Sequence, residues 1–384
     1  MLLISTSLFV SAWIVVPPPT SLLLPLGVVA PEISPWLVVL NVIGMLLALV
    51  GCRGLPRRLA WAGGLAGLLL SALPLVQLPA VEQQLEAAMQ RGLGVNYLAQ
   101  VSGPVQAQMR SQPFVLADVF TGLEPVKARY TAGIRFTTPD QVSLSLDLYR
   151  PLQVGSYPAI VVLYGGGWQN GSPRQNVEFN RYMAARGYTV FAIDYRHAPR
   201  YRFPNQLEDV HSALAFIRQH AAQYEADPAR IALLGRSAGA HLAMLAAYQT
   251  TPLPVQAVVS YYGPVDLTDG YANPPQPDPL DVRVILKAFL GGSPQELPHQ
   301  YQVASPISYV THPLLPTLLV YGGRDHVVQV RFGRQLFARL RQVGSTAVLL
   351  EIPWAEHAFD SLFSGLSNQL ALYHTERFLA WALR

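Results

Sequence analysis

The sequence has little charge and almost no cysteine. Charged residues make up 13 % of its 384 residues, whereas a soluble globular chain usually carries about 25 %. The single cysteine, Cys52, excludes an intramolecular disulfide and a thiolate metal cluster. Lysine occurs only as Lys127 and Lys287, and no segment forms a basic stripe despite the net charge of +4. The sequence therefore lacks the electrostatic footprint of a nucleic-acid partner.

The shortage of charge is concentrated near the N-terminus. The charged residues of segment 1–80 are Glu32, Arg53, Arg57 and Arg58. Uncharged stretches cover residues 1–31, 33–52 and 59–81. The second and third are long enough to cross about 30 Å of hydrocarbon. Prolines at 17–19 interrupt the first stretch, which could be a further span, a re-entrant segment or a signal peptide. The absence of a basic residue before its apolar run argues against the signal peptide. We predict an integral, multi-pass membrane region of two or three helices in residues 1–81.

Arginines between the second and third stretches predict the orientation. Positively charged loops stay on the cytoplasmic side of a membrane, which places Arg53, Arg57 and Arg58 inside. The third stretch then leads outward whether there are two spans or three. The sequence therefore predicts that everything beyond the membrane region is extracytoplasmic. Residues 82–125 are more polar, and we expect a connecting helix and linker there.

Residues 126–384 alternate short apolar runs with helical stretches, as in a mostly parallel sheet covered on both faces. The predicted strands are 128–136, 142–149, 159–164, 189–194, 231–234, 257–261, 317–321 and 347–352. The predicted helices are 176–186, 207–225, 240–249, 330–343 and 361–383. Eight strands predict one doubly wound α/β domain, with ligands at the carboxyl ends of the strands. The proline-rich connection 264–316, with one expected helix at 281–290, is interpreted as either a lid or a passive insertion.

Two glycine-rich turns follow predicted strands. Residues 235–239, GRSAG, place Ser237 between small neighbours at a strand-to-helix turn, as a nucleophilic serine requires. Residues 164–168, YGGGW, form the other turn. The N–H groups of Gly166, Gly167 and Ala238 are suited to bind the oxyanion of a tetrahedral intermediate. A phosphate-binding turn is the alternative, but Asn170 stands where its third glycine belongs.

A nucleophilic serine needs a base, and the base needs a carboxylate that orients it. Asp325 follows the seventh predicted strand and His357 follows the eighth. The order Ser237, Asp325, His357 is the order of an α/β-hydrolase triad. Rival groups are Glu356, Asp360 and His326. The nine histidines show no metal-ligand spacing, and we expect neither a metal nor a cofactor.

With these motifs, the domain resembles the α/β-hydrolase superfamily, in particular the bacterial hormone-sensitive-lipase-like esterases. The matching segments are YGGGW (164–168), DYRHAPRYRFPNQLEDV (194–210), GRSAGAHLA (235–243), GGRDHVV (322–328) and EHAFD (356–360). The segment GRSAGAHLA is also similar to the elbow of kynurenine-formamidase-type enzymes. The resemblance implies catalytic roles for Ser237 (nucleophile), His357 (base and acid) and Asp325 (orienting carboxylate). It also implies an oxyanion hole at Gly166, Gly167 and Ala238, and a structural role for residues 194–196.

Two residues depart from the family pattern. Tyr164 replaces the usual histidine before the glycines, and we expect its hydroxyl to brace the loop by a hydrogen bond. Arg236 replaces the usual aspartate or histidine before the serine. We expect it to pair with a surface carboxylate, with recognition of an anionic substrate as the alternative. Trp168 is the predicted substrate-binding residue, and it forms the expected pocket wall together with residues 264–316.

These observations predict a membrane-anchored serine hydrolase that cleaves carboxylic esters through an acyl-enzyme, as an esterase or lipase. The expected substrate is a small-molecule or lipid ester. An amide or formamide hydrolase of the same fold is one alternative, and a non-catalytic, hydrolase-like membrane receptor is another. The complete triad argues against the receptor. Acyl-chain length, the alcohol portion and the oligomeric state do not follow from the sequence.

Overall fold

The computed structural model describes residues 2–249 and 255–384. Its central element is an eight-stranded sheet in the order β1-β2-β4-β3-β5-β6-β7-β8. The strands are β1 (Arg129–Thr137), β2 (Ser143–Arg150), β3 (Tyr157–Leu163), β4 (Thr189–Ile193), β5 (Ala226–Arg236), β6 (Ala257–Tyr261), β7 (Thr317–Gly322) and β8 (Ala347–Ile352). β1 and β2 pair antiparallel with their neighbours, and the others run parallel. The predicted mostly parallel sheet is confirmed.

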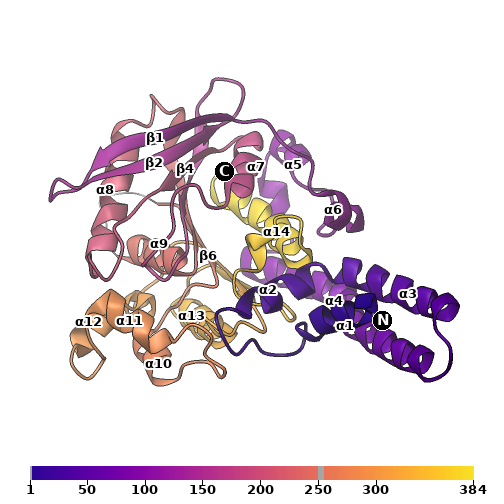
Figure 1. Ribbon diagram of the computed structural model, residues 1–384. Coiled ribbons are helices and arrows are strands. Elements are labelled where there is room, and N and C mark those ends of the chain that lie inside the picture. Colours follow the sequence, from indigo (N-terminus) through magenta and orange to yellow (C-terminus); the bar gives the residue numbers. More distant parts are fainter. Residues whose placement is uncertain (1, 250–254) are drawn as a thin grey trace.

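Helices cover both faces of the sheet, which explains why its central strands are continuous apolar runs. Every residue of β4, β6 and β7 is buried. α7 (Val177–Ala185) and α14 (Leu366–Ala382) lie on one side, and α8 (Asn205–Gln219) and α9 (Ala238–Tyr248) lie on the other (Figure 1). α13 (Val330–Gln342) packs against β7 and β8. The strand register places Leu163 beside Gly235 and Gly235 beside Ser260, so that β3, β5 and β6 end at one edge.

The connection between β6 and β7 forms a helical cap over that edge. It contains α10 (Leu267–Ala272), α11 (Val282–Leu290), α12 (Pro298–Val303) and the 3₁₀ turn η2 (Pro306–Tyr309). The predicted helix at 281–290 corresponds to α11, which buries Leu286, Phe289 and Leu290 and exposes Val284. The other two helices were not expected because each has only six residues, too few to establish a helical period.

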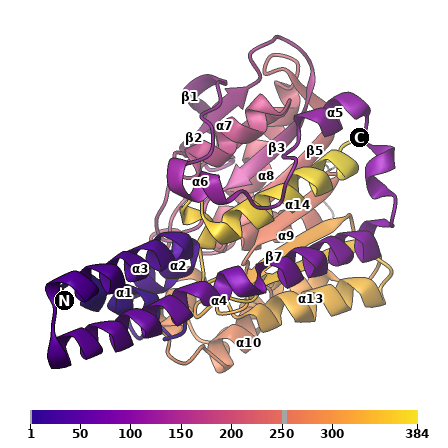
Figure 2. The same cartoon turned by 90° about the vertical axis from the view of Figure 1, so that its right-hand side faces the viewer.

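The helices nearest the N-terminus are α1 (Leu2–Ala12), α2 (Leu24–Glu32), α3 (Ser34–Gly51) and α4 (Gly54–Leu93). α1, α3 and α4 form a bundle that projects away from the sheet (Figure 2). Asn41 of α3 donates to Ser11 Oγ (3.2 Å) and accepts from Ser7 Oγ (2.8 Å) of α1. Gly67 permits close approach of α4, because a Cβ atom there would lie 2.3 Å from Asn41 Oδ1. Small residues and interhelical polar contacts are typical of helices that pack within membranes.

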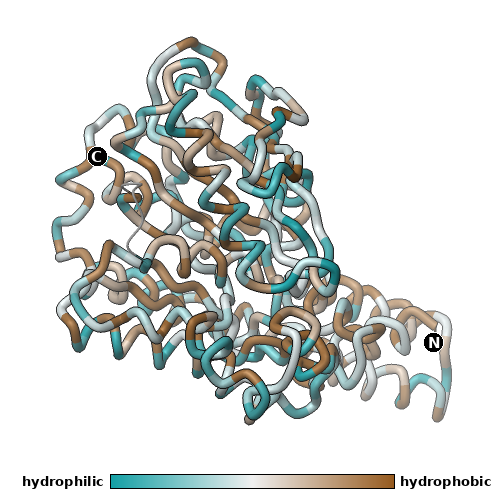
Figure 3. The backbone as a smooth tube through the Cα atoms, turned by 90° about the vertical axis from the view of Figure 1, so that its left-hand side faces the viewer, coloured by the Kyte–Doolittle hydropathy of each residue, from teal (hydrophilic) through white to brown (hydrophobic). Residues whose placement is uncertain are grey.

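The bundle directs large apolar side chains outward. Val50, Val76 and Leu69 are 90 %, 76 % and 62 % exposed, and hydrophobic positions recur along the helices around the N-terminus (Figure 3). Among the described residues, α3 and α4 are the helices long and apolar enough to cross a membrane, judged by length and composition. α1 and α2 have 11 and 9 residues, so the first uncharged stretch is not one span-length helix.

α4 continues beyond the third uncharged stretch. It is a single helix of 40 residues, and its last turns lie along β8 (Figure 2). Leu85 and Met89 are buried in the same core as the sheet. The expected connecting helix from residue 82 is therefore the end of α4, because the change to polar composition marks a change of surroundings rather than a helix end. The remaining elements before the sheet are η1 (Tyr97–Gln100), α5 (Gly103–Gln108) and α6 (Leu116–Thr121).

Candidate active site

Ser237 lies at a strained turn between β5 and α9. Its backbone has φ 52° and ψ −120°, a region that L-residues with side chains rarely adopt. Glycines make the turn compact: a Cβ atom at Gly235 would lie 2.3 Å from the Gly239 carbonyl oxygen, and one at Gly239 would lie 2.3 Å from that of Leu163. The turn thereby presents the serine hydroxyl at the carboxyl edge of the sheet, as the G-x-S-x-G spacing predicted.

The structure brings the three predicted catalytic side chains into one hydrogen-bonded chain. Ser237 Oγ lies 3.0 Å from His357 Nε2, and His357 Nδ1 lies 2.8 Å from Asp325 Oδ2. The other carboxylate oxygen of Asp325 accepts from the N–H groups of Val327 (2.8 Å) and Val328 (2.7 Å). This arrangement directs the Nδ1 proton of His357 to Asp325 and leaves Nε2 to accept the serine proton.

The electrostatics of the site act on His357. Burial works to lower the pKa of His357, but the carboxylate of Asp325, with smaller contributions from Glu356 and Asp360, outweighs it. The result is a pKa above the ordinary value for histidine. The buried imidazole is thus surrounded by the negative charge that stabilises an imidazolium during proton transfer.

The rival groups of the sequence have other partners. Glu356 accepts from the backbone N–H of His326 (2.6 Å), and its second oxygen lies 2.6 Å from His326 Nδ1. Asp360 pairs with Arg236 and accepts a hydrogen bond from Tyr262. The expected carboxylate partner of Arg236 is therefore present, but Asp360 is buried and not on the surface.

The glycine loop after β3 packs directly on the serine turn. A Cβ atom at Gly165 would lie 3.0 Å from the Arg236 carbonyl oxygen. Gly166 and Gly167 have φ of 138° and 59°, which glycine adopts most readily. In the part of the chain that the structure describes, no hydrogen bond takes the backbone N–H of Gly166, Gly167 or Ala238. All three line the cavity beside Ser237, so the predicted oxyanion donors are free there.

Tyr164 braces this loop as expected. Its hydroxyl donates to Asp194 Oδ1 (2.5 Å) and lies 2.9 Å from His197 Nε2. Its ring stacks on Tyr195 with centroids 4.4 Å apart, and the Tyr195 hydroxyl donates to the Tyr164 carbonyl oxygen (3.0 Å). Burial is the main cause that raises the pKa of Tyr164, so the phenol keeps its proton as a donor.

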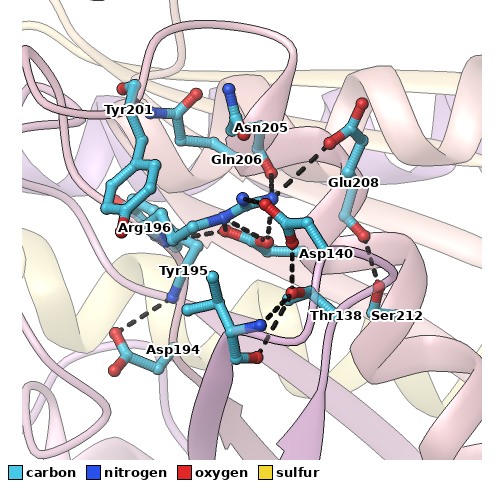
Figure 4. A network of polar contacts seen from close by, with 12 residues as sticks. Thr138, Asp140, Asp194, Tyr195, Arg196, Tyr201, Asn205, Gln206, Glu208 and Ser212 are labelled. Atoms are coloured by element: carbon cyan, nitrogen blue, oxygen red, sulfur yellow. Dashed lines mark hydrogen bonds and ion pairs between the residues drawn. The ribbon is translucent and has the colours of Figure 1, made fainter.

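Arg196 fixes the next part of the same loop. Its backbone N–H donates to Asp209 Oδ2 and its Nε to Asp209 Oδ1, both at 2.8 Å. Its guanidinium also forms ion pairs with Asp140 and, at 3.5 Å, with Glu208 (Figure 4). These contacts join the loop after β4 to α8 and to the β1–β2 turn, in line with the structural role expected of this segment.

A cavity of about 690 Å³ opens next to Ser237 and His357. This volume is ordinary for a small-molecule site. Its apolar wall combines the cap with the start of α13, including Ile285, Leu286 and Phe332. Trp168 also lines the cavity and stacks on Phe289 of α11 with ring centroids 4.1 Å apart. Trp168 and residues of segment 264–316 therefore line the cavity, as the sequence predicted for the pocket wall.

His241 supports this wall and was missed in the sequence. Trp168 Nε1 donates to His241 Nδ1 (3.2 Å), and His241 Nε2 lies 2.6 Å from the Ala304 carbonyl oxygen of the cap. Burial lowers the pKa of His241 to about 4, so the ring is neutral and can accept from the indole. His241 stands four residues after Ser237 on α9, and that helical spacing was the available signal.

A doubly wound sheet with a serine elbow, an acid after β7 and a histidine after β8 is an α/β-hydrolase. The family model BD-FAE matches residues 146–340, which is half of the chain, and the chain belongs to this family. The expected likeness to hormone-sensitive-lipase-like esterases is confirmed by the comparisons that follow.

Two Mycobacterium tuberculosis proteins are similar to this chain over 252 residues each. The probable carboxylic ester hydrolase LipM is 33 % identical, over 61 % of this chain and 57 % of its own length. Esterase LipC is 34 % identical, over 61 % of both. The chain thus spans less than two thirds of either relative.

Solved structures share the fold. The bacterial heroin esterase has a TM-score of 0.61 at 22 % identity, covering 75 % of this chain and 99 % of that one. The hyperthermophilic esterase of the archaeon Pyrobaculum calidifontis has the same TM-score and identity, covering 80 % and 99 %.

Proposed function

We propose that this protein is a serine hydrolase that cleaves carboxylic esters. The observation that carries the proposal is the chain of two hydrogen bonds from Ser237 through His357 to Asp325, beside free N–H groups at the wall of a largely apolar cavity. The names of the mycobacterial relatives, a carboxylic ester hydrolase and an esterase, support an ester as the bond that is cleaved.

In the proposed acylation step, Ser237 Oγ attacks the carbonyl carbon of the ester while His357 Nε2 takes the hydroxyl proton. The carbonyl oxygen becomes an oxyanion, which accepts hydrogen bonds from the N–H groups of Gly166, Gly167 and Ala238. Collapse of this intermediate breaks the bond to the alcohol oxygen. His357 returns the proton to that oxygen, the alcohol leaves, and the acyl group stays on Ser237.

Deacylation repeats these steps with water. His357 takes a proton from the water, whose oxygen attacks the acyl-enzyme, and the same N–H groups bind the second oxyanion. Breakdown of the intermediate returns the proton to Ser237 and releases the carboxylic acid. Asp325 stays ionised and keeps the imidazole in the required tautomer.

The test uses the full chain in detergent micelles, with p-nitrophenyl esters from acetate to palmitate and p-nitroanilides of the same acyl groups. We expect ester hydrolysis, and covalent labelling of Ser237 by a fluorophosphonate, located by mass spectrometry. Faster cleavage of the anilides would favour the amide hydrolase. A folded protein that neither reacts with the probe nor cleaves any substrate would favour the receptor. Membrane lipids are assayed in parallel, and rates on the short soluble esters far above those on the lipids would exclude a lipid ester as the preferred substrate.

We also propose that α3 and α4 anchor the hydrolase in a membrane, with the hydrolase domain on the extracytoplasmic side. Their length, their composition and the exposed apolar side chains of the bundle support the anchor. The orientation rests on Arg53, Arg57 and Arg58 in and next to the short α3–α4 connection.

The lone cysteine of the chain makes this orientation testable. Cys52 lies in the α3–α4 connection and is partly exposed. In a bacterial host, we expect a membrane-impermeant maleimide to label Cys52 in inverted vesicles and not in intact spheroplasts. The matched control carries Cys52→Ser and Val154→Cys, since Val154 is 80 % exposed in the hydrolase domain. The control is expected to show the opposite pattern. Labelling of Cys52 in intact spheroplasts would refute the orientation.

A further inference from the structure

A buried ion pair joins the two loops that carry the proposed nucleophile and base. Arg236 immediately precedes Ser237, and Asp360 lies three residues after His357, in the 3₁₀ turn η3 (Phe359–Ser361). Arg236 Nε donates to Asp360 Oδ2, and the two side chains are only 4 % and 2 % exposed. Tyr262, which follows β6, donates its hydroxyl to the other carboxylate oxygen. We call these three residues, Arg236, Asp360 and Tyr262, the loop clamp.

The loop clamp contacts the histidine directly. The ring of Tyr262 packs edge-on against the imidazole of His357, with centroids 4.6 Å apart and an interplanar angle of 61°. Phe359, next to Asp360, also packs edge-on against the Tyr262 ring, with centroids 5.5 Å apart and an interplanar angle of 79°. Tyr262 thus contacts His357 through its ring and Asp360 through its hydroxyl.

Aromatic rings also fix the arginine. The guanidinium carbon of Arg236 lies 4.5 Å from the ring centroid of Phe179 and 5.3 Å from that of Tyr261. Cations over aromatic faces are attracted by the ring quadrupole. The guanidinium of Arg236, which belongs to the serine turn, therefore contacts both core aromatic rings and the loop that carries His357. Its charge is balanced by Asp360 of that loop.

The histidine loop needs such support because its backbone is strained. Ala358, directly after His357, has φ 56° and ψ 32°, the left-handed region that residues with a Cβ atom rarely adopt. One hydrogen bond to Asp325 orients the imidazole but does not by itself set the distance from Nε2 to the serine. A displacement of about 1 Å between reacting groups can cost about 100-fold in rate.

On the basis of the proposed function, we propose that Arg236, Asp360 and Tyr262 are positioning residues that set the distance between Ser237 Oγ and His357 Nε2. The ion pair connects the serine turn to the loop that carries His357, and the ring of Tyr262 packs against the imidazole and restricts its position. This role also explains the replacement at position 236: an arginine is long enough to bridge the two loops, and with its charge matched by Asp360 it is not free to recruit an anionic substrate.

The test removes the polar groups of the loop clamp and keeps their volume, in the triple variant Arg236→Met, Asp360→Leu, Tyr262→Phe. Replacing a whole buried ion pair by apolar residues leaves no unpaired charge and often preserves stability. We expect kcat for p-nitrophenyl butyrate and the rate of fluorophosphonate labelling to fall together by about 10- to 100-fold, with KM within about threefold. The matched control is Arg129→Met, Arg150→Met, Glu225→Leu, which removes the ion-pair cluster of Glu225 with both arginines at the opposite end of β5. It is expected to lower the melting temperature without lowering kcat.

Three outcomes separate the explanations. A folded triple variant with kcat within twofold of wild type would overturn the positioning role. A raised KM with kcat retained would assign Arg236 to substrate binding instead, for which its Nη1, buried without a partner among the described residues, would be the donor. Wild-type protein that neither reacts with the probe nor hydrolyses esters would refute the proposed function itself.

If the triple variant does not fold, a single variant tests the positioning role. Tyr262→Phe removes one hydroxyl and keeps the ring against His357. We expect kcat to fall about three- to tenfold, because one donor to a buried carboxylate is lost. No change in kcat or in the labelling rate would overturn the role of Tyr262 and, with it, the loop clamp.

Discussion

Replacement of Ser237 by alanine is expected to lower kcat for p-nitrophenyl butyrate by about 10⁴- to 10⁶-fold. The hydroxyl is the atom that forms the acyl-enzyme in the proposed reaction, and no other hydroxyl lies within hydrogen-bonding distance of His357 Nε2 among the described residues. The residual rate would come from the oxyanion donors and from substrate binding, which act without the serine. KM should change little, because the substrate contacts of the cavity remain.

The control for this variant is Ser212→Ala. Ser212 lies on α8, where its hydroxyl donates to the Glu208 carbonyl oxygen, away from the cavity. It should keep wild-type kcat, and both variants should keep the wild-type melting temperature to within a few degrees. Retention of more than about one hundredth of kcat by Ser237→Ala would contradict the serine mechanism, since triad serines contribute far more than that.

Asp325→Asn is expected to lower kcat by about 10⁴-fold, although the side chain keeps its size. The carboxylate accepts from the Nδ1 proton of His357 and from two backbone N–H groups. An amide in its place supports the other imidazole tautomer, in which Nε2 carries the proton and cannot accept one from Ser237. This substitution therefore removes the required tautomer of the base and leaves the fold in place.

The pH dependence provides a second measurement of the same variant. His357 must be neutral to act as a base, so the rate should rise as the pH passes through the pKa of His357. The charges around His357 hold this pKa above 6.5, its ordinary value, so the acidic limb of kcat/KM should lie above pH 6.5 in the wild type. In Asp325→Asn the charge that raises the pKa of His357 is lost, while burial still lowers this pKa. The acidic limb of kcat/KM should therefore move to lower pH.

Glu356→Gln is the comparison for Asp325→Asn, because Glu356 neighbours the histidine in sequence. Its carboxylate accepts from His326 and from the backbone N–H of His357 but does not contact the imidazole of His357, and we expect a loss of less than about tenfold. If Glu356→Gln were as inactive as Asp325→Asn, the assignment of the orienting acid would have to be reconsidered.

Local signals in the sequence account for most of the fold. Each of the eight predicted strands is present. The central ones were predictable because continuous apolar segments between turns have few other uses in a domain of this size. The ends of long elements were harder to place. α4 was divided at residue 82 because its surroundings change from apolar to mixed there, while its hydrogen-bonded path does not change.

Part of the candidate site was likewise predictable from the sequence, and part was not. Ser237, Asp325 and His357 were predictable because each follows a strand, and the carboxyl ends of parallel strands meet at one edge. The partner of Arg236 was not predictable, since 124 residues separate it from Asp360. Neither was the role of Tyr262, whose sequence neighbours resemble those of any residue after a buried strand. Contacts of this kind depend on how loops pack, which has no periodic signature.

The continuity of α4 has a consequence for how this protein can be handled. β8 is the last strand of the sheet, and α4 lies along it and contributes Leu85 and Met89 to the core. An uncovered edge strand is a template for intermolecular pairing. A chain cut before the sheet to obtain a water-soluble enzyme would lose this cover together with the proposed anchor. Solubility therefore has to come from detergent, or from polar substitutions on the outward faces of the bundle, with α4 left whole.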